Sequence, residues 1–121
     1  MATGKETLAR AMKLDGALAT ALVDYTSNRV LGTAGGGAAF DIDAAARGNV
    51  AVLRAKRNLM RQLGIEGGVD DILITLDAQY HLIRPLHKHP HLFLYLAIRR
   101  DLGNLARARQ KLKELGEALD P

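Results

Sequence analysis

The sequence predicts an α+β fold in which a five-stranded, mainly antiparallel sheet carries helices on both faces. Helix and strand patterns follow one another in the order helix, strand, strand, helix, strand, strand, strand, helix. Most connections are about two to six residues long, too short for the crossovers that parallel neighbours need, with the long central helix as the exception. The length of 121 residues suits one domain, which we expect to span residues 1–121.

The N-terminal part of the chain predicts one helix and one hairpin. Residues 5–14 place apolar side chains at helical spacing and end at Asp15-Gly16, a turn-forming pair. Residues 17–23 are apolar and of strand length, and the strand pattern resumes at Val30-Leu31 after a turn rich in Asp, Ser and Asn. The glycine-rich segment 32–37 is expected to be neither helix nor strand but a loop that leads into the longest helix.

The middle of the chain predicts a long helix and a second hairpin. The helix spans about residues 41–63, with carboxylates near its positively polarised start and Gly64 after its end. Gly67-Gly68 forms a turn, and residues 69–76 and 80–86 then read as two paired strands.

The C-terminal part predicts a central strand followed by a helix. Residues 91–98 (HLFLYLAI) are almost continuously apolar, as expected of a strand inside a sheet. Residues 102–119 place apolar side chains at helical spacing and predict a helix with a single apolar stripe. The stripe consists of Leu102, Leu105, Ala108, Leu112, Leu115 and Leu119.

Composition excludes several classes of protein. Hydrophobic residues make up 48% and charged residues 25% of the chain, which is ordinary for a globular domain and excludes disordered and fibrous classes. No apolar run has the length of a membrane-spanning helix, and residues 1–10 lack the apolar stretch of a signal peptide, so we expect a cytoplasmic protein without a membrane partner. The absence of Cys removes disulfides, thiolate nucleophiles and cysteine-based zinc sites.

The side chains of the long helix sort into three arcs when successive residues are placed about 100° apart. One arc is large and apolar, the next consists of small residues, and the third is basic. The first two arcs together exceed half the circumference, which is more than a helix on the sheet of a monomer needs. The apolar arc comprises Ile42, Ala45, Val52, Leu53, Leu59, Met60 and Leu63, the small strip Ala44, Gly48, Ala51 and Ala55, and the basic arc Arg47, Arg54, Arg57 and Arg61.

The small strip favours pairing of this helix with the same helix of a second copy. Small side chains three or four residues apart let two helix backbones approach closely, which predicts a two-fold homodimer. The alternative is that the alanines are simply good helix formers and face solvent. Lys56 falls inside the apolar arc, so it either extends past the edge of the core or lies at the dimer interface.

No residue pattern predicts catalysis or a cofactor. The glycines of segment 32–37 are followed by Ala38-Ala39 in place of the Lys and hydroxyl residue of a phosphate-binding loop. Ser27, the single serine, lies in a turn, where it serves backbone hydrogen bonding. Asp70-Asp71 and Asp77 mark strand and turn boundaries. We therefore expect a protein that is not an enzyme, with no catalytic residue and no cofactor.

Four histidines form the only cluster with metal-binding chemistry in the sequence. His87, His89 and His91 alternate along the chain and follow His81 on the preceding predicted strand. Neutral imidazoles bind zinc, nickel or copper, but no carboxylate is near in sequence to complete or orient a site. A histidine-rich surface loop is the preferred interpretation, and no metal ligand is assigned.

The net charge of +4 favours an acidic partner. The basic residues divide between the long helix and residues 99–113, while the charged residues of segment 62–83 are all acidic. An aromatic content of 4% leaves no stacking platform for nucleic-acid bases, so binding to nucleic acid would rest on charge alone. A protein partner is the better interpretation, with Arg47, Arg54, Arg57 and Arg61 as the candidate partner-binding residues.

Three stretches of the chain resemble the Roadblock/LC7 family, and in particular its small stand-alone members from actinomycetes. Residues 21–36 (ALVDYTSNRVLGTAGG) look like the first hairpin of the family, and residues 71–86 (DILITLDAQYHLIRPL) look like its middle hairpin. Residues 90–115 (PHLFLYLAIRRDLGNLARARQKLKEL) look like its last strand and helix. The chain departs from the family at Asn28, where a turn glycine is usual, and at Arg99, where an acid is common.

The resemblance implies a three-layer α/β/α domain of the profilin-like or longin-like kind, with the order αββαβββα. It also implies a homodimer in which the long helices pair and the strands equivalent to residues 69–76 meet edge to edge. Members of the family act as non-catalytic regulators or scaffolds for small Ras-like GTPases, bacterial polarity switches or motor complexes. The dimer-interface residues predicted on this basis are Ala44, Gly48, Ala51, Ala55, Val69, Ile72 and Ile74.

Three functions are compatible with the sequence. The first is a regulatory or scaffold homodimer that binds a small Ras-like GTPase or a related signalling complex through its sheet and helix surfaces. The second is a basic adaptor for nucleic acid or another acidic partner. The third is a small-molecule sensor domain, because profilin-like sheets also serve that role.

Overall fold

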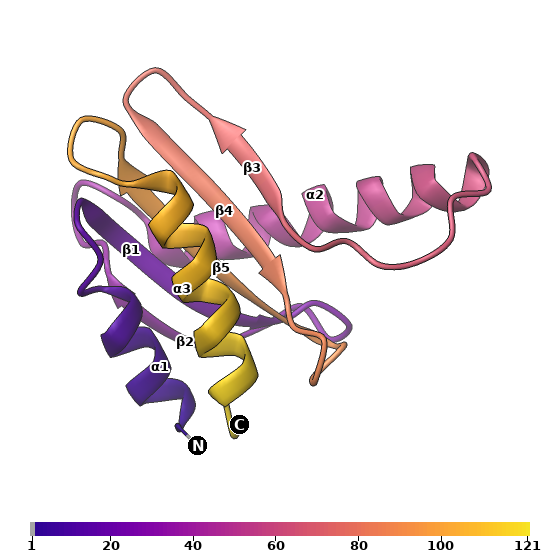
Figure 1. Cartoon of the computed structure of the whole chain (residues 1–121), viewed down its shortest axis with the longest axis horizontal. Helices are drawn as coiled ribbons and strands as arrows, with labels where there is room; N and C mark the ends of the chain where they lie inside the picture. Colours follow the sequence, from indigo (N-terminus) through magenta and orange to yellow (C-terminus); the bar gives the residue numbers. More distant parts are fainter. Residues whose placement is uncertain (1) are drawn as a thin grey trace.

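The computed structural model of the chain describes residues 2–121 and has the predicted order of elements. Figure 1 shows α1 and α3 side by side on one face of the sheet and the long helix α2 on the other. The predicted α+β class and the three layers are therefore confirmed. The elements are α1 (Gly4–Ala11), β1 (Ala17–Asp24), β2 (Arg29–Gly35), α2 (Ile42–Gln62), β3 (Ile72–Thr75), β4 (Gln79–Pro85), β5 (Leu92–Arg99) and α3 (Leu105–Ala118).

The sheet has the strand order β2-β1-β5-β4-β3, and every neighbouring pair is antiparallel. β5 lies at the centre, and its residues from Leu92 to Ile98 are all buried, as the apolar run predicted. The pairing of β1 with β5 joins the N-terminal hairpin to the C-terminal three-stranded meander. At this junction the buried Thr20 hydroxyl donates a hydrogen bond of 2.7 Å to the carbonyl oxygen of Tyr95.

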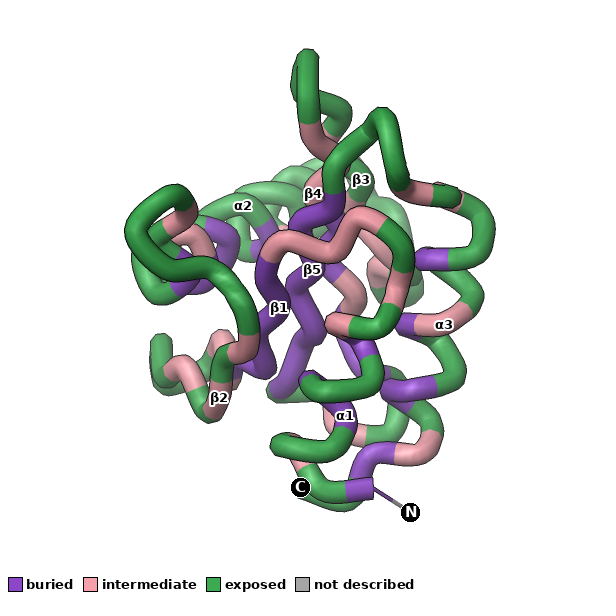
Figure 2. The backbone as a smooth tube through the Cα atoms, turned by 90° about the vertical axis from the view of Figure 1, so that its left-hand side faces the viewer, coloured by how far each residue is buried: buried purple, intermediate pink, exposed green. Residues whose placement is uncertain are grey.

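Side chains of the central strands alternate between two hydrophobic cores. On one face, leucines of β4 and β5 pack against α1 and α3. On the other face, Phe93 and Tyr95 belong to the core that packs under α2. Figure 2 shows the buried lengths of β1 and β5 between these two layers of helices. Both faces of the sheet are covered, which is why β5 could be nearly all apolar.

The three helices begin at side chains that cap their first backbone N–H groups. Thr3 and Glu6 form a reciprocal capping box at α1, and Asp41 accepts from the Ala44 N–H at 3.0 Å at the start of α2. Asn104 accepts from the backbone N–H of Arg107 at 3.0 Å, so α3 begins at residue 105 and not at residue 102. Leu102 is 55% exposed, and its assignment to the apolar stripe was wrong.

Two other elements are shorter than the sequence predicted. α1 ends at Ala11 and not at residue 14, because Lys13 and Leu14 make tight turns back to Arg10 and Ala11. β3 starts at Ile72 and not at residue 69. Asp71, just before it, instead accepts hydrogen bonds of 2.7 and 3.1 Å from the guanidinium of Arg109 on α3.

The glycine-rich segment also differs from its prediction as a loop from residue 32 onward. β2 continues as far as Gly35, which pairs with Ala19 of β1. Gly35 has φ +74°, and a Cβ there would lie 2.5 Å from the carbonyl oxygen of Leu18. Glycine therefore allows the strand to continue where any other residue would be both strained and obstructed.

Replacing Gly35 by alanine is expected to lower the free energy of unfolding by about 1–3 kcal/mol, because it adds a positive-φ strain and a collision with backbone. Urea unfolding followed by circular dichroism measures the change. Gly68→Ala is the matched control, since a Cβ at Gly68 would meet no heavy atom within 4 Å. Equal losses of folding stability in Gly35→Ala and Gly68→Ala would contradict the requirement for glycine at position 35 of β2.

Candidate interaction surface on helix α2

Helix α2 contacts the sheet only through its first half. Its buried residues are Ile42, Ala46, Asn49, Val50 and Leu53, and none of its residues after Leu53 is buried. Figure 1 shows the second half of α2 continuing beyond the edge of the sheet. Neither α2 nor another helix within residues 2–121 has the length and apolar character needed to cross a membrane.

The predicted apolar arc of this helix was only partly correct. Leu53 is fully buried, but Val52 is 37%, Leu59 43% and Leu63 63% exposed. Three buried positions of α2 lie outside the predicted arc: Ala46, Asn49 and Val50. The polar one is Asn49, whose side-chain amide donates to the Ala45 carbonyl at 2.7 Å. A polar side chain can occupy this position because a local backbone acceptor satisfies it.

The exposed apolar residues of α2 adjoin the predicted strip of small residues. Ala44, Gly48, Ala51 and Ala55 are all exposed, as is Lys56 of the apolar arc. A contiguous apolar surface of this kind is typical of a protein–protein contact. We call the surface the α2 apolar face; it consists of Ala44, Gly48, Ala51, Val52, Ala55, Leu59 and Leu63.

Strand β3 forms one edge of the sheet. In residues 2–121 it pairs with β4 alone, so its other edge is unpaired. Val69, Ile72 and Ile74, the predicted interface residues of this segment, are half-buried, and the first two pack against the core under α2. An unpaired edge presents backbone donors and acceptors that a second strand can bind.

Three of the four predicted partner-binding arginines gather beside the β1–β2 turn. Arg57 donates to the hydroxyl of Tyr25 at 2.6 Å and lies 4.8 Å over the centre of its ring. Arg54 donates to the Tyr25 carbonyl at 2.5 Å, and Arg61 contacts the Asn58 side chain. These side chains line an open cavity of about 340 Å³. Sequence reasoning missed Tyr25, which lies 32 residues away from Arg57 along the chain.

The positive charge of this arginine cluster is not neutralised by acidic side chains within residues 2–121. The Nε of Arg57 is buried and has no hydrogen-bond partner within residues 2–121. In the same part of the chain no acidic side chain forms an ion pair with Arg54, Arg57 or Arg61. Arg47, the fourth predicted residue, is exposed nearer the start of α2 and does not line the cavity. Unpaired guanidinium groups suit carboxylates of a partner.

The four histidines do not come together. His81 lies on β4, His87 lies 3.3 Å from a carboxylate oxygen of Asp70, and Nε2 of His89 lies 3.1 Å from the Leu119 carbonyl. Within residues 2–121 no three His, Asp or Glu side chains are grouped so that they could hold a metal ion.

His81 belongs to a polar cluster under α2. Its Nε2 lies 2.7 Å from the Gln79 side-chain oxygen, which can only accept, so Nε2 carries the proton. Its Nδ1 then accepts from the Tyr95 hydroxyl at 3.0 Å. Burial lowers the pKa of His81 below its ordinary value of 6.5 and raises the pKa of Tyr95 to about 12. Both groups are therefore uncharged at neutral pH.

The free energy of unfolding is expected to fall as the pH drops below 6.5, the ordinary pKa of histidine. The unfolded chain binds a proton at His81 before the folded chain does, so the stability present above this pKa is lost below it. Urea unfolding at several pH values between neutral and mildly acidic measures the loss. His81→Gln should flatten this dependence, whereas His91→Gln, at an exposed position, should preserve it. If the free energy of unfolding varied with pH in the same way in both variants, the pH dependence could not be assigned to His81.

Comparison with known proteins establishes the fold. No protein-family model and no curated protein matches the sequence. MglB of Myxococcus xanthus has a TM-score of 0.79 at 16% identity, with 92% of this chain and 80% of that one covered. The Roadblock/LC7 domain from Streptomyces avermitilis has a TM-score of 0.79 at 13% identity, with 93% and 90% covered. The gliding protein MglB from Thermus thermophilus has a TM-score of 0.69 at 19% identity, with 94% and 88% covered. The resemblance predicted from the sequence is confirmed at the level of the fold.

Proposed function

We propose that this chain, whose fold is that of Roadblock/LC7 domains, is a non-catalytic homodimer that regulates or scaffolds a small Ras-like GTPase or a related signalling complex. The observation that carries the proposal is the α2 apolar face. It is exposed in the single chain, lies on the longest helix, and combines small residues with Val52, Leu59 and Leu63. Exposing such an apolar face to water is unfavourable in free energy, and a second copy that covers the face removes this cost.

The dimer would pair the two α2 helices around a two-fold axis. Ala44, Gly48, Ala51 and Ala55 would let the helix backbones approach closely, with the larger apolar residues packing beside them. The free edges of β3 would meet in the same arrangement and extend the sheet across both copies. One solved structure of MglB, at 19% identity, is described as a tetrameric arrangement, so self-association occurs in a protein of this fold.

The arginine cluster would be the contact for the partner. In a two-fold dimer it occurs twice and flanks the paired helices, which concentrates positive charge beside a new surface. An acidic patch on the GTPase or its complex would pair with Arg47, Arg54, Arg57 and Arg61. The association should therefore weaken as the salt concentration rises.

Two measurements test the proposal. Sedimentation of the full chain should give about twice the chain mass of 13.1 kDa, and a strict monomer at high concentration would overturn the dimer. Purified small GTPases from the native host, loaded with GDP or a non-hydrolysable GTP analogue, should bind the dimer in a nucleotide-dependent way. Arg54→Glu should weaken that binding and Lys5→Glu, an exposed residue of α1, should not. A dimer that binds none of these GTPases would overturn the proposal that a small GTPase is the partner.

A further inference from the structure

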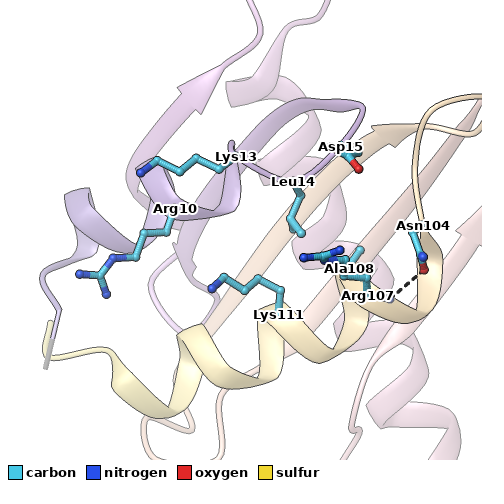
Figure 3. Close-up of a pocket in the computed structure, with 8 residues that line it drawn as sticks. All are labelled: Arg10, Lys13, Leu14, Asp15, Asn104, Arg107, Ala108 and Lys111. Atoms are coloured by element: carbon cyan, nitrogen blue, oxygen red, sulfur yellow. Dashed lines mark hydrogen bonds between the residues drawn. The ribbon is translucent and has the colours of Figure 1, made fainter.

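A second basic surface lies across the sheet from α2, in a groove between α1 and α3. The groove has a volume of about 370 Å³. Leu14 and Ala108 form its floor, because Ala108 is only 1% exposed and Leu14 is half-buried between the helices. In Figure 3 the long cationic side chains extend along the two sides of the groove, from the α1 segment above and from α3 below. These cations are Arg10 and Lys13 on the α1 side and Arg107 and Lys111 on α3.

The charges of this groove are poorly neutralised within the chain. Asp15 is the one acid among the residues that line it, and Figure 3 places Asp15 with Asn104 at one end, away from Arg10. Arg10 lies 3.8 Å from Glu6, but both side chains are about half exposed, so this pair is weak. Within residues 2–121 the other three cations form no ion pair. Four like charges around one groove repel each other until an anion binds between them.

We propose that the α1–α3 groove binds an acidic segment of a partner protein. The two cations on each side would pair with carboxylates of a narrow chain that lies between the helices. A small apolar side chain of the same segment would contact the recessed floor at Leu14 and Ala108. Asp15 would repel the segment at one end and so fix how far it extends.

The shape of the groove disfavours the other polyanions. A bilayer needs apolar side chains that protrude beyond the cations, whereas the apolar residues here lie at the bottom of the groove. Single-stranded nucleic acid binds through bases stacked on aromatic rings, and no aromatic residue lines the groove. A segment of polypeptide with several carboxylates is the anion that meets both the charge and the recessed floor.

The α1–α3 groove is separate from the proposed dimer interface. The groove belongs to the α1 and α3 face of the sheet, and the α2 apolar face belongs to the opposite one. A dimer paired through α2 would leave both grooves open and would carry two of them, on its outer sides. The chain could then hold an acidic segment and a partner on α2 at the same time.

The experiment measures binding of a fluorescein-labelled octaglutamate peptide to the full chain by fluorescence anisotropy at low ionic strength. The double variant Arg107→Glu and Lys111→Glu should weaken binding by about tenfold or more, as expected for reversing one exposed and one half-buried charge of the groove. The control Lys5→Glu and Lys113→Glu makes the same change in net charge on the two helices that flank the groove, at positions outside it. It should weaken binding by less than about threefold. Asp15→Asn should strengthen binding.

Several outcomes would contradict binding of an acidic segment in the groove. Equal losses in the two double variants, or no binding of the peptide, would overturn the proposal. So would groove-dependent binding of phosphatidylserine vesicles or single-stranded DNA in place of the peptide. Amide chemical shifts of the unmodified chain give a readout that needs no variant: the peptide should perturb residues 10–15 and 104–111, and perturbation confined to α2 would overturn the assignment. Sedimentation of the same samples shows whether the chain dimerises, so an absent dimer can be told apart from absent peptide binding in the groove.

Discussion

Ala51→Glu is expected to convert the proposed dimer into a monomer. Ala51 lies in the α2 apolar face, and the two-fold arrangement would bring the two new carboxylates close together in a contact without water. An unpaired buried charge of this kind costs about 3–5 kcal/mol, so the dissociation constant of the dimer should rise more than about 100-fold. The fold itself should survive, because the Ala51 side chain is exposed in the single chain and glutamate is a good helix former.

Sedimentation across a range of protein concentrations measures the change, and far-ultraviolet circular dichroism checks the fold. Ala106→Glu is the matched control, since it makes the same substitution at an exposed position of α3, on the other face of the sheet. It should leave the dimer intact. A dimer that survives Ala51→Glu with an unchanged dissociation constant would show that α2 is not its interface.

Leu53→Ala is expected to lower the free energy of unfolding by about 2–5 kcal/mol. Leu53 is fully buried and is the last residue of α2 in contact with the core under the helix. Removing its side chain leaves a cavity between helix and sheet at the point from which the second half of α2 extends. Leu59→Ala makes the same chemical change on the same helix, but Leu59 is 43% exposed, so its effect on the single chain should stay within about 0.5 kcal/mol.

Both leucine variants are best measured by urea unfolding in the Ala51→Glu background, where dimerisation does not add to stability. In the unmodified background Leu59→Ala should instead raise the dissociation constant of the proposed dimer, because Leu59 lies in the α2 apolar face. Similar losses of folding stability from both variants in the monomer would contradict the described position of α2 on the sheet.

Local patterns in the sequence were sufficient for the order of elements. The continuous apolar run of β5 identified the central strand, since only a strand covered on both sides can be apolar on both. Asp41 identified the start of α2 because its carboxylate caps the first turn. Asn28 takes φ 58° in the first hairpin, as expected for an asparagine in place of the usual turn glycine.

Features that depend on contacts between distant segments were not predictable from these patterns. Angular position on a helix does not reveal where the helix leaves the sheet, so it could not show that Val52, Leu59 and Leu63 of the apolar arc are exposed. The Arg57–Tyr25 contact joins a helix to a turn that the sequence does not link. The extension of β2 to Gly35 depends on pairing with β1, which overrides the weak strand preference of glycine.

The pairing of β1 with β5 has a consequence for how the chain folds. The hairpin of β1 and β2 and the meander of β3, β4 and β5 each form from neighbours in sequence, but the bond from Thr20 to Tyr95 joins residues 75 apart. Closing so long a loop costs entropy before the buried contacts of the central strands repay it. We therefore expect the search for this one pairing to limit the rate at which the two halves become a single sheet.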